Sequence, residues 1–109
     1  MAEAGSVVVN VLESLTAKGE HPNVELLSDS PELRLVRFDL APGVEVKGHR
    51  ADAIVALYAL AGGGRVTAGG RESPFRAGDL AVCQRNEVHG FTAGAEGLAV
   101  LAAIAPSPE

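Results

Sequence analysis

Short apolar stretches separated by turn residues run along most of this chain. The longest are Ala53–Ala61 and Leu98–Ala105, and neither contains a charged residue. Turn signals recur about every 8–12 residues, which is typical of an all-β sandwich or barrel. We therefore predict roughly eight to ten short strands. Their centres are Val7–Val9, Val24–Leu27, Leu33–Leu40, Val44–Val46, Ala53–Ala61, Arg65–Ala68, Glu72–Arg76, Leu80–Cys83, His89–Thr92 and Leu98–Ala105.

Three local patterns refine this picture. Asn10 is predicted to cap a turn, with one or two helical turns over Val11–Leu15. The glycine runs Gly62–Gly64 and Gly69–Gly70 are predicted to form hairpin tips. Strand alternation in Leu33–Leu40 separates two faces, one with Leu33, Leu35, Arg37 and Asp39, the other with Arg34, Val36, Phe38 and Leu40.

Composition excludes several classes of protein. The chain has 109 residues, enough for one domain. Hydrophobic residues make up 47% and charged residues 21%, which is too apolar for intrinsic disorder. A formal net charge of −5 argues against a phosphate-binding surface, so we expect no nucleic-acid partner. No apolar run is long enough to span a bilayer, so we expect no membrane partner either.

The N-terminal sequence and the cysteine content point to a compartment. Residues 1–9 lack a basic stretch, and Asn10 and Glu13 interrupt the apolar run early, unlike a secretory signal. Cys83 is the single cysteine, so no intrachain disulfide can form. We expect a cytoplasmic protein.

Two segments resemble the conserved motifs of the cupin family. Gly43 and His49 fit the start of the first motif, and Gly62 fits its end. Gly78 and His89 fit the second motif, with the family-like phrase Arg76-Ala77-Gly78-Asp79-Leu80 around it. The resemblance implies a double-stranded β-helix (jelly-roll) barrel over residues 33–105. Residues 1–32 would pack on it as a strand and loop segment, and 106–109 would form a tail.

The same resemblance implies a homodimer and a metal site, but the sequence departs from the ligand pattern. Of the four ligand positions, His49 and His89 are kept, while Ala51 and Val55 stand where the family has histidine and glutamate. A divalent transition metal (Fe, Mn, Ni or Zn) needs three or four protein ligands. Asp52 is a candidate third ligand, although three residues on from His49 it falls on the opposite strand face. Other candidate donors are His21, Tyr58, Cys83 and Gln84.

Without metal, the two histidines remain candidate polar groups of a pocket, or general bases. Glu87 is a candidate hydrogen-bond acceptor for one of them. The apolar replacements suggest a largely apolar pocket for a small molecule. Its predicted lining is His49, Ala51, Val55, Leu57, Ala59, His89 and Phe91. The alternative is that the aliphatic side chains among these simply fill the barrel.

Three functions stay open at this point. The leading hypothesis is a small-molecule-binding cupin with an incomplete metal site, because Ala51 and Val55 remove two ligands. The alternative is a metal-dependent dioxygenase or isomerase that uses His49, His89 and a non-standard third ligand. A third possibility is an assembly module with a filled barrel. Cys83 is either a thiol activated by Arg85 or a buried apolar residue, and we favour the second. His21 is expected in an exposed loop.

Overall fold

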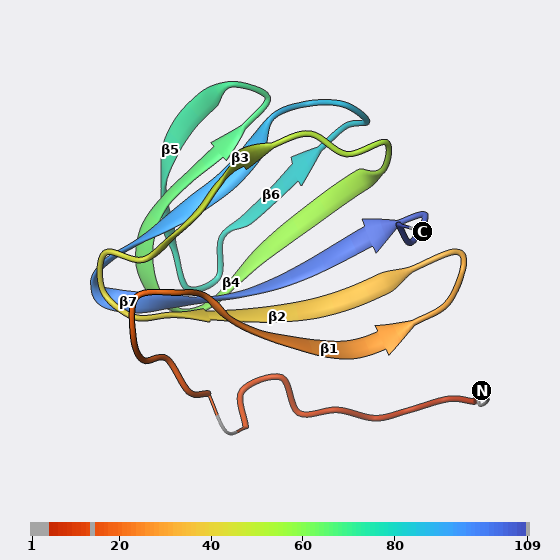
Figure 1. Ribbon diagram of the computed structural model, residues 1–109, viewed down its shortest axis with the longest axis horizontal. Helices are drawn as coiled ribbons and strands as arrows, with labels where there is room; N and C mark the ends of the chain where they lie inside the picture. Colours follow the sequence, from red (N-terminus) through yellow and green to blue (C-terminus); the bar gives the residue numbers. More distant parts are fainter. Residues whose placement is uncertain (1–4, 14, 109) are drawn as a thin grey trace.

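The computed structural model describes residues 5–13 and 15–108, and its regular structure there consists of strands (Figure 1). No part of this described chain forms a helix long and apolar enough to cross a membrane. The strands are β1 (Asn23–Asp29), β2 (Arg34–Leu40), β3 (Glu45–His49), β4 (Ile54–Ala68), β5 (Arg71–Arg76), β6 (Leu80–Cys83) and β7 (His89–Ala105).

The strands form two layers because β4 and β7 are long and bend. The first half of β4 pairs with β6 and with the second half of β7, which also pairs with β2. The second half of β4 pairs with β5 and with the first half of β7, which also pairs with β3. All pairings are antiparallel, and β1 extends the first layer beyond β2. The predicted all-β jelly-roll barrel is confirmed (Figure 1).

Two predictions about strand ends are wrong. Gly62–Gly64 is not a hairpin tip but lies inside β4, at the bend between the layers. A Cβ on Gly62 would collide with the carbonyl of Gly97, and one on Gly64 with the carbonyl of Thr92. The glycines therefore allow the close approach of two bent strands. For the same reason His89–Thr92 and Leu98–Ala105 belong to one strand, so the described chain has seven strands rather than eight to ten.

The prediction of a strand at Val7–Val9 is also wrong, because these residues are exposed and lie outside the seven strands. The other element predictions hold with small shifts. Gly69–Gly70 forms the predicted turn between β4 and β5. Asn10 caps a turn, since its Oδ1 accepts a hydrogen bond from the backbone N–H of Leu12 at 2.9 Å. Residues 11–13 form a single turn in place of the expected helical turns, and Ser14 lies outside the described residues.

Apolar side chains from both layers meet in one core. Its fully buried members include Leu40, Leu57, Phe75, Cys83 and Val100, each at most 1% exposed. The core also contains Phe38 and Phe91, whose rings meet edge to face with centroids 5.3 Å apart. Such close packing fixes the strands that carry the candidate site.

The N-terminal segment covers part of the outer side of the first layer. Arg37 and Asp39 lie on that side of β2 and are 4% and 3% exposed. The Arg37 guanidinium donates to the carbonyls of Val11 and Glu13 and to the Glu25 carboxylate. The backbone N–H of Thr16 donates to Asp39 Oδ2 at 3.0 Å. These contacts attach Val11, Glu13 and Thr16 to the barrel.

Candidate functional site

The two motif histidines come together at one end of the second layer. His49 in β3 and His89 in β7 are register partners, and their rings meet edge to face with centroids 4.2 Å apart. A β-bulge between Val46 and His49 sets this register. Gly90 permits the bulge, because a Cβ there would stand 2.7 Å from the carbonyl oxygen of Val46. The sequence prediction that His49 and His89 share a site agrees with this geometry.

Each imidazole is oriented by a backbone carbonyl two residues before it. His49 Nδ1 lies 3.0 Å from the carbonyl oxygen of Lys47, and His89 Nδ1 lies 3.2 Å from that of Glu87. A carbonyl only accepts hydrogen bonds, so Nδ1 carries the proton in the neutral ring. The Nε2 atom of each ring is then the unprotonated one, available to accept a hydrogen bond or to bind a metal.

The two rings differ in their exposure. His49 is exposed, whereas His89 is only 5% exposed. Burial lowers the pKa of His89 below the ordinary 6.5, since desolvation disfavours the imidazolium. The charge on His49 acts in the same direction, and the hydrogen bond to the Glu87 carbonyl opposes it. His89 is therefore a neutral imidazole at pH 7.

The candidate third ligand has a different partner. Asp52 Oδ1 accepts a 2.7 Å hydrogen bond from Arg85 in an exposed ion pair. The Glu87 carboxylate accepts a 2.7 Å hydrogen bond from the backbone N–H of Gln84. The hydrogen bond from His89 therefore goes to the backbone carbonyl of Glu87 and not to its side chain. Across residues 5–13 and 15–108, no three His, Cys, Asp or Glu side chains cluster as a metal site would require. The described residues thus supply two imidazoles and do not complete a ligand set.

Comparison with known proteins decides the family. The family model for the cupin domain matches residues 36–104, well over half of the chain. The chain belongs to the cupin family. No curated protein sequence matches this cupin.

Solved structures agree with this assignment. An RmlC-like cupin from Desulfovibrio desulfuricans is 25% identical with a TM-score of 0.84, covering 94% of this chain and 98% of the other. A Klebsiella pneumoniae protein with a double-stranded β-helix domain is 21% identical with a TM-score of 0.82, covering 94% and 91%. KdgF from a Halomonas species is 19% identical with a TM-score of 0.81, covering 97% of each chain. The last two similarities concern the fold alone.

Most of the expected pocket lining of this cupin lies in its core. Val55, Leu57, Ala59 and Phe91 are at most 4% exposed and belong to one hydrophobic cluster. Ala51 is half-buried and lines a separate hollow of about 370 Å³ beside the C-terminal residues Pro106–Pro108. The accessible part of the candidate site is therefore the histidine end, where His49 reaches solvent.

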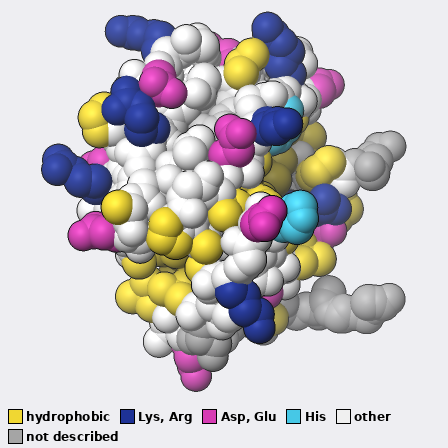
Figure 2. All heavy atoms as spheres, turned by 60° about the vertical axis from the view of Figure 1, so that its left-hand side comes forward, with side chains coloured by type: hydrophobic (Ala, Val, Ile, Leu, Met, Phe, Trp, Pro, Cys, Tyr) yellow, Lys and Arg dark blue, Asp and Glu magenta, His cyan; other side chains and the backbone are white. Residues whose placement is uncertain are grey.

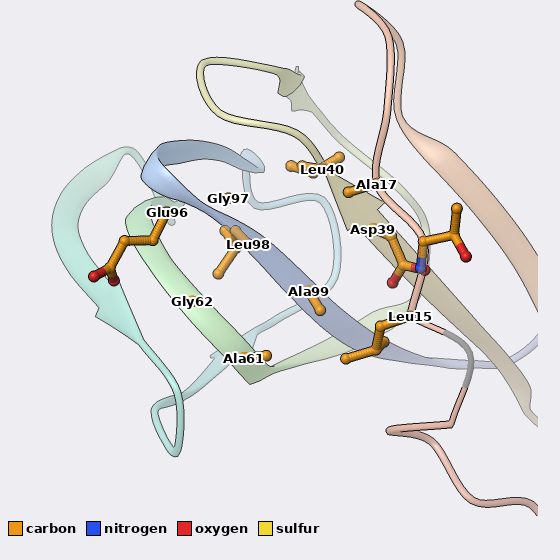
Figure 3. A pocket seen from close by; sticks show the side chains of 11 residues that line it. Leu15, Ala17, Asp39, Leu40, Ala61, Gly62, Glu96, Gly97, Leu98 and Ala99 are labelled. Carbon is orange, nitrogen blue, oxygen red and sulfur yellow. The ribbon is translucent and has the colours of Figure 1, made fainter.

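A second hollow, which the sequence did not predict, lies between the N-terminal segment and the bend of the barrel. Its volume is about 150 Å³. Leu15 and Ala17 of the N-terminal segment line it together with Leu98 and Ala99 of β7, and Figure 3 shows the Glu96 side chain pointing away from them. Asp39 also lines it, but Thr16 and Arg37 engage its carboxylate.

The remaining candidate groups stand apart from the histidine pair. Cys83 is fully buried, and burial raises the pKa of its thiol, with the charge of Glu87 acting in the same direction. Arg85, the expected activator of this thiol, is paired with Asp52. These contacts favour the interpretation of Cys83 as a buried apolar residue. His21 is exposed in its loop, as expected.

Proposed function

We propose that this cupin binds a small, largely apolar molecule that donates a hydrogen bond to the His49–His89 pair. One observation carries the proposal: both Nδ1 atoms face backbone carbonyls, which leaves an unprotonated Nε2 on each of two rings whose centroids are 4.2 Å apart. A neutral imidazole with a fixed tautomer is a directed acceptor for a hydroxyl, N–H or carboxylic acid group. Val46 lies on the same strand as His49 and is only partly buried, which suits a ligand with an apolar body.

Nuclear magnetic resonance of the imidazole nitrogens tests this proposal. We expect the Nδ1–H tautomer in His49 and His89 of the free protein. Adding small hydroxylated or acidic fragments should shift the Nε2 resonances of the pair. His21 is the matched control, because it is an exposed histidine in a loop outside the pair and should not shift. Variants His49→Phe and His89→Phe should lose the response, whereas His21→Phe should keep it. Fragment binding that survives in both pair variants would reject the proposed site.

A metal-dependent enzyme of the dioxygenase or isomerase type is the second candidate function. It is favoured by the backbone hydrogen bonds at both Nδ1 atoms, since metal-binding imidazoles are commonly oriented in this way. When bound, a divalent transition metal would supply Lewis-acid or redox chemistry at Nε2 of His49 and His89. The described side chains do not complete its ligand set.

Elemental analysis separates the two functions. Fe, Mn, Ni or Zn bound in near-stoichiometric amount, and lost in the His49→Ala/His89→Ala double variant, would favour the enzyme. Metal retained in that variant would place it elsewhere. Protein that stays metal-free after reconstitution would favour the binding protein.

A further inference from the structure

The hollow between the N-terminal segment and the bend of the barrel, here called the segment hollow, has mostly apolar walls. Leu15 and Ala17 of the segment form one wall, and the other includes Leu40 of β2 with Leu98 and Ala99 of β7. The barrel wall is at most 6% exposed, whereas Ala17 is exposed, so the hollow opens to solvent at the segment. Its volume of about 150 Å³ is enough for a molecule about the size of benzene.

Asp39 is the buried polar group of the segment hollow. Its side chain is 3% exposed, and Figure 3 shows the carboxylate directed toward Leu15. Oδ2 accepts a hydrogen bond from the backbone N–H of Thr16, whereas Oδ1 receives no hydrogen bond from the part of the chain that the structure describes. Buried polar atoms normally have a hydrogen-bond partner. Oδ1 is therefore a buried acceptor at the wall of the hollow that can still take up a donor.

The charges around the segment hollow favour a cation. Arg37 Nε lies 3.4 Å from Asp39 Oδ1, but the same guanidinium is 2.7 Å from the Glu25 carboxylate and donates to two backbone carbonyls of the segment. One positive charge is thus shared between two negative ones. Glu96 adds a further negative charge at the exposed rim, and none of the described lining residues is Lys or Arg. A second cation would complete the charge balance of the buried carboxylate.

We propose that the segment hollow binds a small primary ammonium compound with an apolar body, whose ammonium group donates a hydrogen bond to Asp39 Oδ1. Hydrogen bonds between charged groups are stronger than neutral ones, and the leucine and alanine walls suit an aliphatic body. A bare metal ion fits less well, since no three metal-binding side chains cluster anywhere in residues 5–13 and 15–108. The described lining residues include neither His49 nor His89, so this site is additional to the proposed function.

The surface near the bend is mixed in the same way. Figure 2 views the molecule from the side on which β4 and β7 bend in Figure 1. Apolar side chains gather in a band there, and charged side chains lie above and below it. A ligand with one charged group and an apolar body matches such a surface better than a multiply charged ion does.

Binding in the segment hollow should hold the N-terminal segment on the barrel. Leu15 and Ala17 form one of its walls, so the complete hollow exists only while the segment is attached. A ligand that binds the attached state alone stabilises that state by mass action. We therefore expect a saturating ligand to slow proteolytic cleavage of the chain before β1.

Three compounds with one carbon skeleton test the ligand class: isopentylamine, isopentanol and isovalerate, at matched pH 7. The amine should shift the backbone amide resonances of Thr16 and Ala99 in nuclear magnetic resonance spectra. The alcohol should bind at least about tenfold more weakly, and the carboxylate should not bind. An alcohol that binds as tightly as the amine, or no response to the amine well into the millimolar range, would overturn the proposal.

Substitutions then locate the site. Asp39→Asn should weaken amine binding about tenfold or more, whereas its control Glu96→Gln, which removes a charge that points away, should change it little. Ala17→Leu fills the hollow from an exposed position, so it should fold and block binding even if Asp39→Asn does not fold. Its control is Ala77→Leu in the exposed turn between β5 and β6. Amine binding that Ala17→Leu retains would refute the assignment.

Two further readouts separate this site from the histidine pair. His49→Phe and His89→Phe should bind isopentylamine as the wild type does, so failure of the histidine proposal leaves this one intact. Loss of amine binding in those variants would place the amine at the pair and overturn the inference. Cleavage before β1 should slow as isopentylamine saturates the protein, and a rate that the amine leaves unchanged would also count against the segment hollow.

Discussion

His89 is both a buried residue of the barrel and a candidate group for binding a ligand. Its ring is almost completely buried, meets the His49 ring edge to face and donates to a backbone carbonyl. Burial leaves little of this side chain open to water. Burial also makes the charged form costly, so the protein's stability depends on the protonation of this ring.

The pKa of His89 predicts loss of stability in mild acid. The folded-state pKa lies below the ordinary 6.5, so the unfolded chain takes up a proton first as the pH falls. Stability is full above about pH 6.5 and decreases as the pH falls toward the folded-state pKa. Thermal unfolding of the wild type from pH 8 to pH 5 should show this decrease. His89→Phe should have a flatter profile, and an equally steep profile in that variant would assign the effect to another group.

Acidic groups act in a separate pH range. The Arg34 side chain, with help from Ser107, lowers the pKa of Asp29 below 3.8. Asp29 therefore contributes stability that is lost only as the pH falls below about 4. Measurements above pH 5 separate the histidine effect from this one.

Cys83 should behave as a buried apolar side chain. It is fully buried, and the pKa of its thiol is raised, so the reactive thiolate is scarce at neutral pH. We expect native protein to react with a thiol reagent far more slowly than protein in denaturant, followed by absorbance or mass spectrometry. Rapid, complete labelling of the folded protein would restore the activated-thiol hypothesis.

The bend in strand β4 depends on glycine. Gly64 has no left-handed backbone requirement, but a Cβ there would collide with the carbonyl of Thr92 in β7. Gly43 is the opposite case, with a φ of 80° and open space around it. Gly43→Ala should cost about 1–2 kcal/mol through backbone strain alone. Gly64→Ala should cost more, since it forces β4 and β7 apart in addition to losing packing.

Denaturant unfolding of the two alanine variants compares these costs. Gly64→Ala should have the lower midpoint. A Gly64→Ala midpoint equal to or above that of Gly43→Ala would contradict the role of Gly64 as the bend between the two layers.

Local pattern was enough to predict most strands, but not the bends. Leu33–Leu40 and Leu80–Cys83 follow from apolar stretches with turn residues on both sides. Gly62–Gly64 was misassigned because glycine suits a hairpin tip and a bend equally well. The choice depends on the carbonyls of Thr92 and Gly97, about 30 residues away in the chain.

The sequence was enough to predict the histidine pair of the candidate site, but not the partners of the residues around it. The motif spacing brought His49 and His89 together, and the structure adds the bulge that aligns them. The partner of Asp52 could not be predicted, because Arg85 reaches it through the fold and not through local sequence. The burial of Arg37 and Asp39 could not be predicted either. Strand alternation only places them on the face opposite Phe38 and Leu40, and the N-terminal segment covers that face through contacts far away in the sequence.

At the scale of the whole molecule, the N-terminal segment and the barrel are joined through charge. Arg37 lies at the centre of this contact, 3.4 Å from Asp39 and 2.7 Å from Glu25. It also donates to two carbonyls of the segment. Removing this buried cation should strongly destabilise the protein, because the carboxylate of Asp39 would stay buried without its charge partner. The segment would at the same time lose its main attachment.

Arg37→Leu should therefore lower the free energy of unfolding by about 3–5 kcal/mol, measured in urea. The double variant Arg37→Leu/Asp39→Leu should recover part of this loss, since no charge is then left buried on that side of β2. Arg65→Leu is the control: Arg65 pairs with Glu72 at the surface, and such a pair contributes about 0–1 kcal/mol. Limited proteolysis of Arg37→Leu should cut first before β1. Equal losses in Arg37→Leu and Arg65→Leu would show that the segment is held by its apolar contacts and not by Arg37.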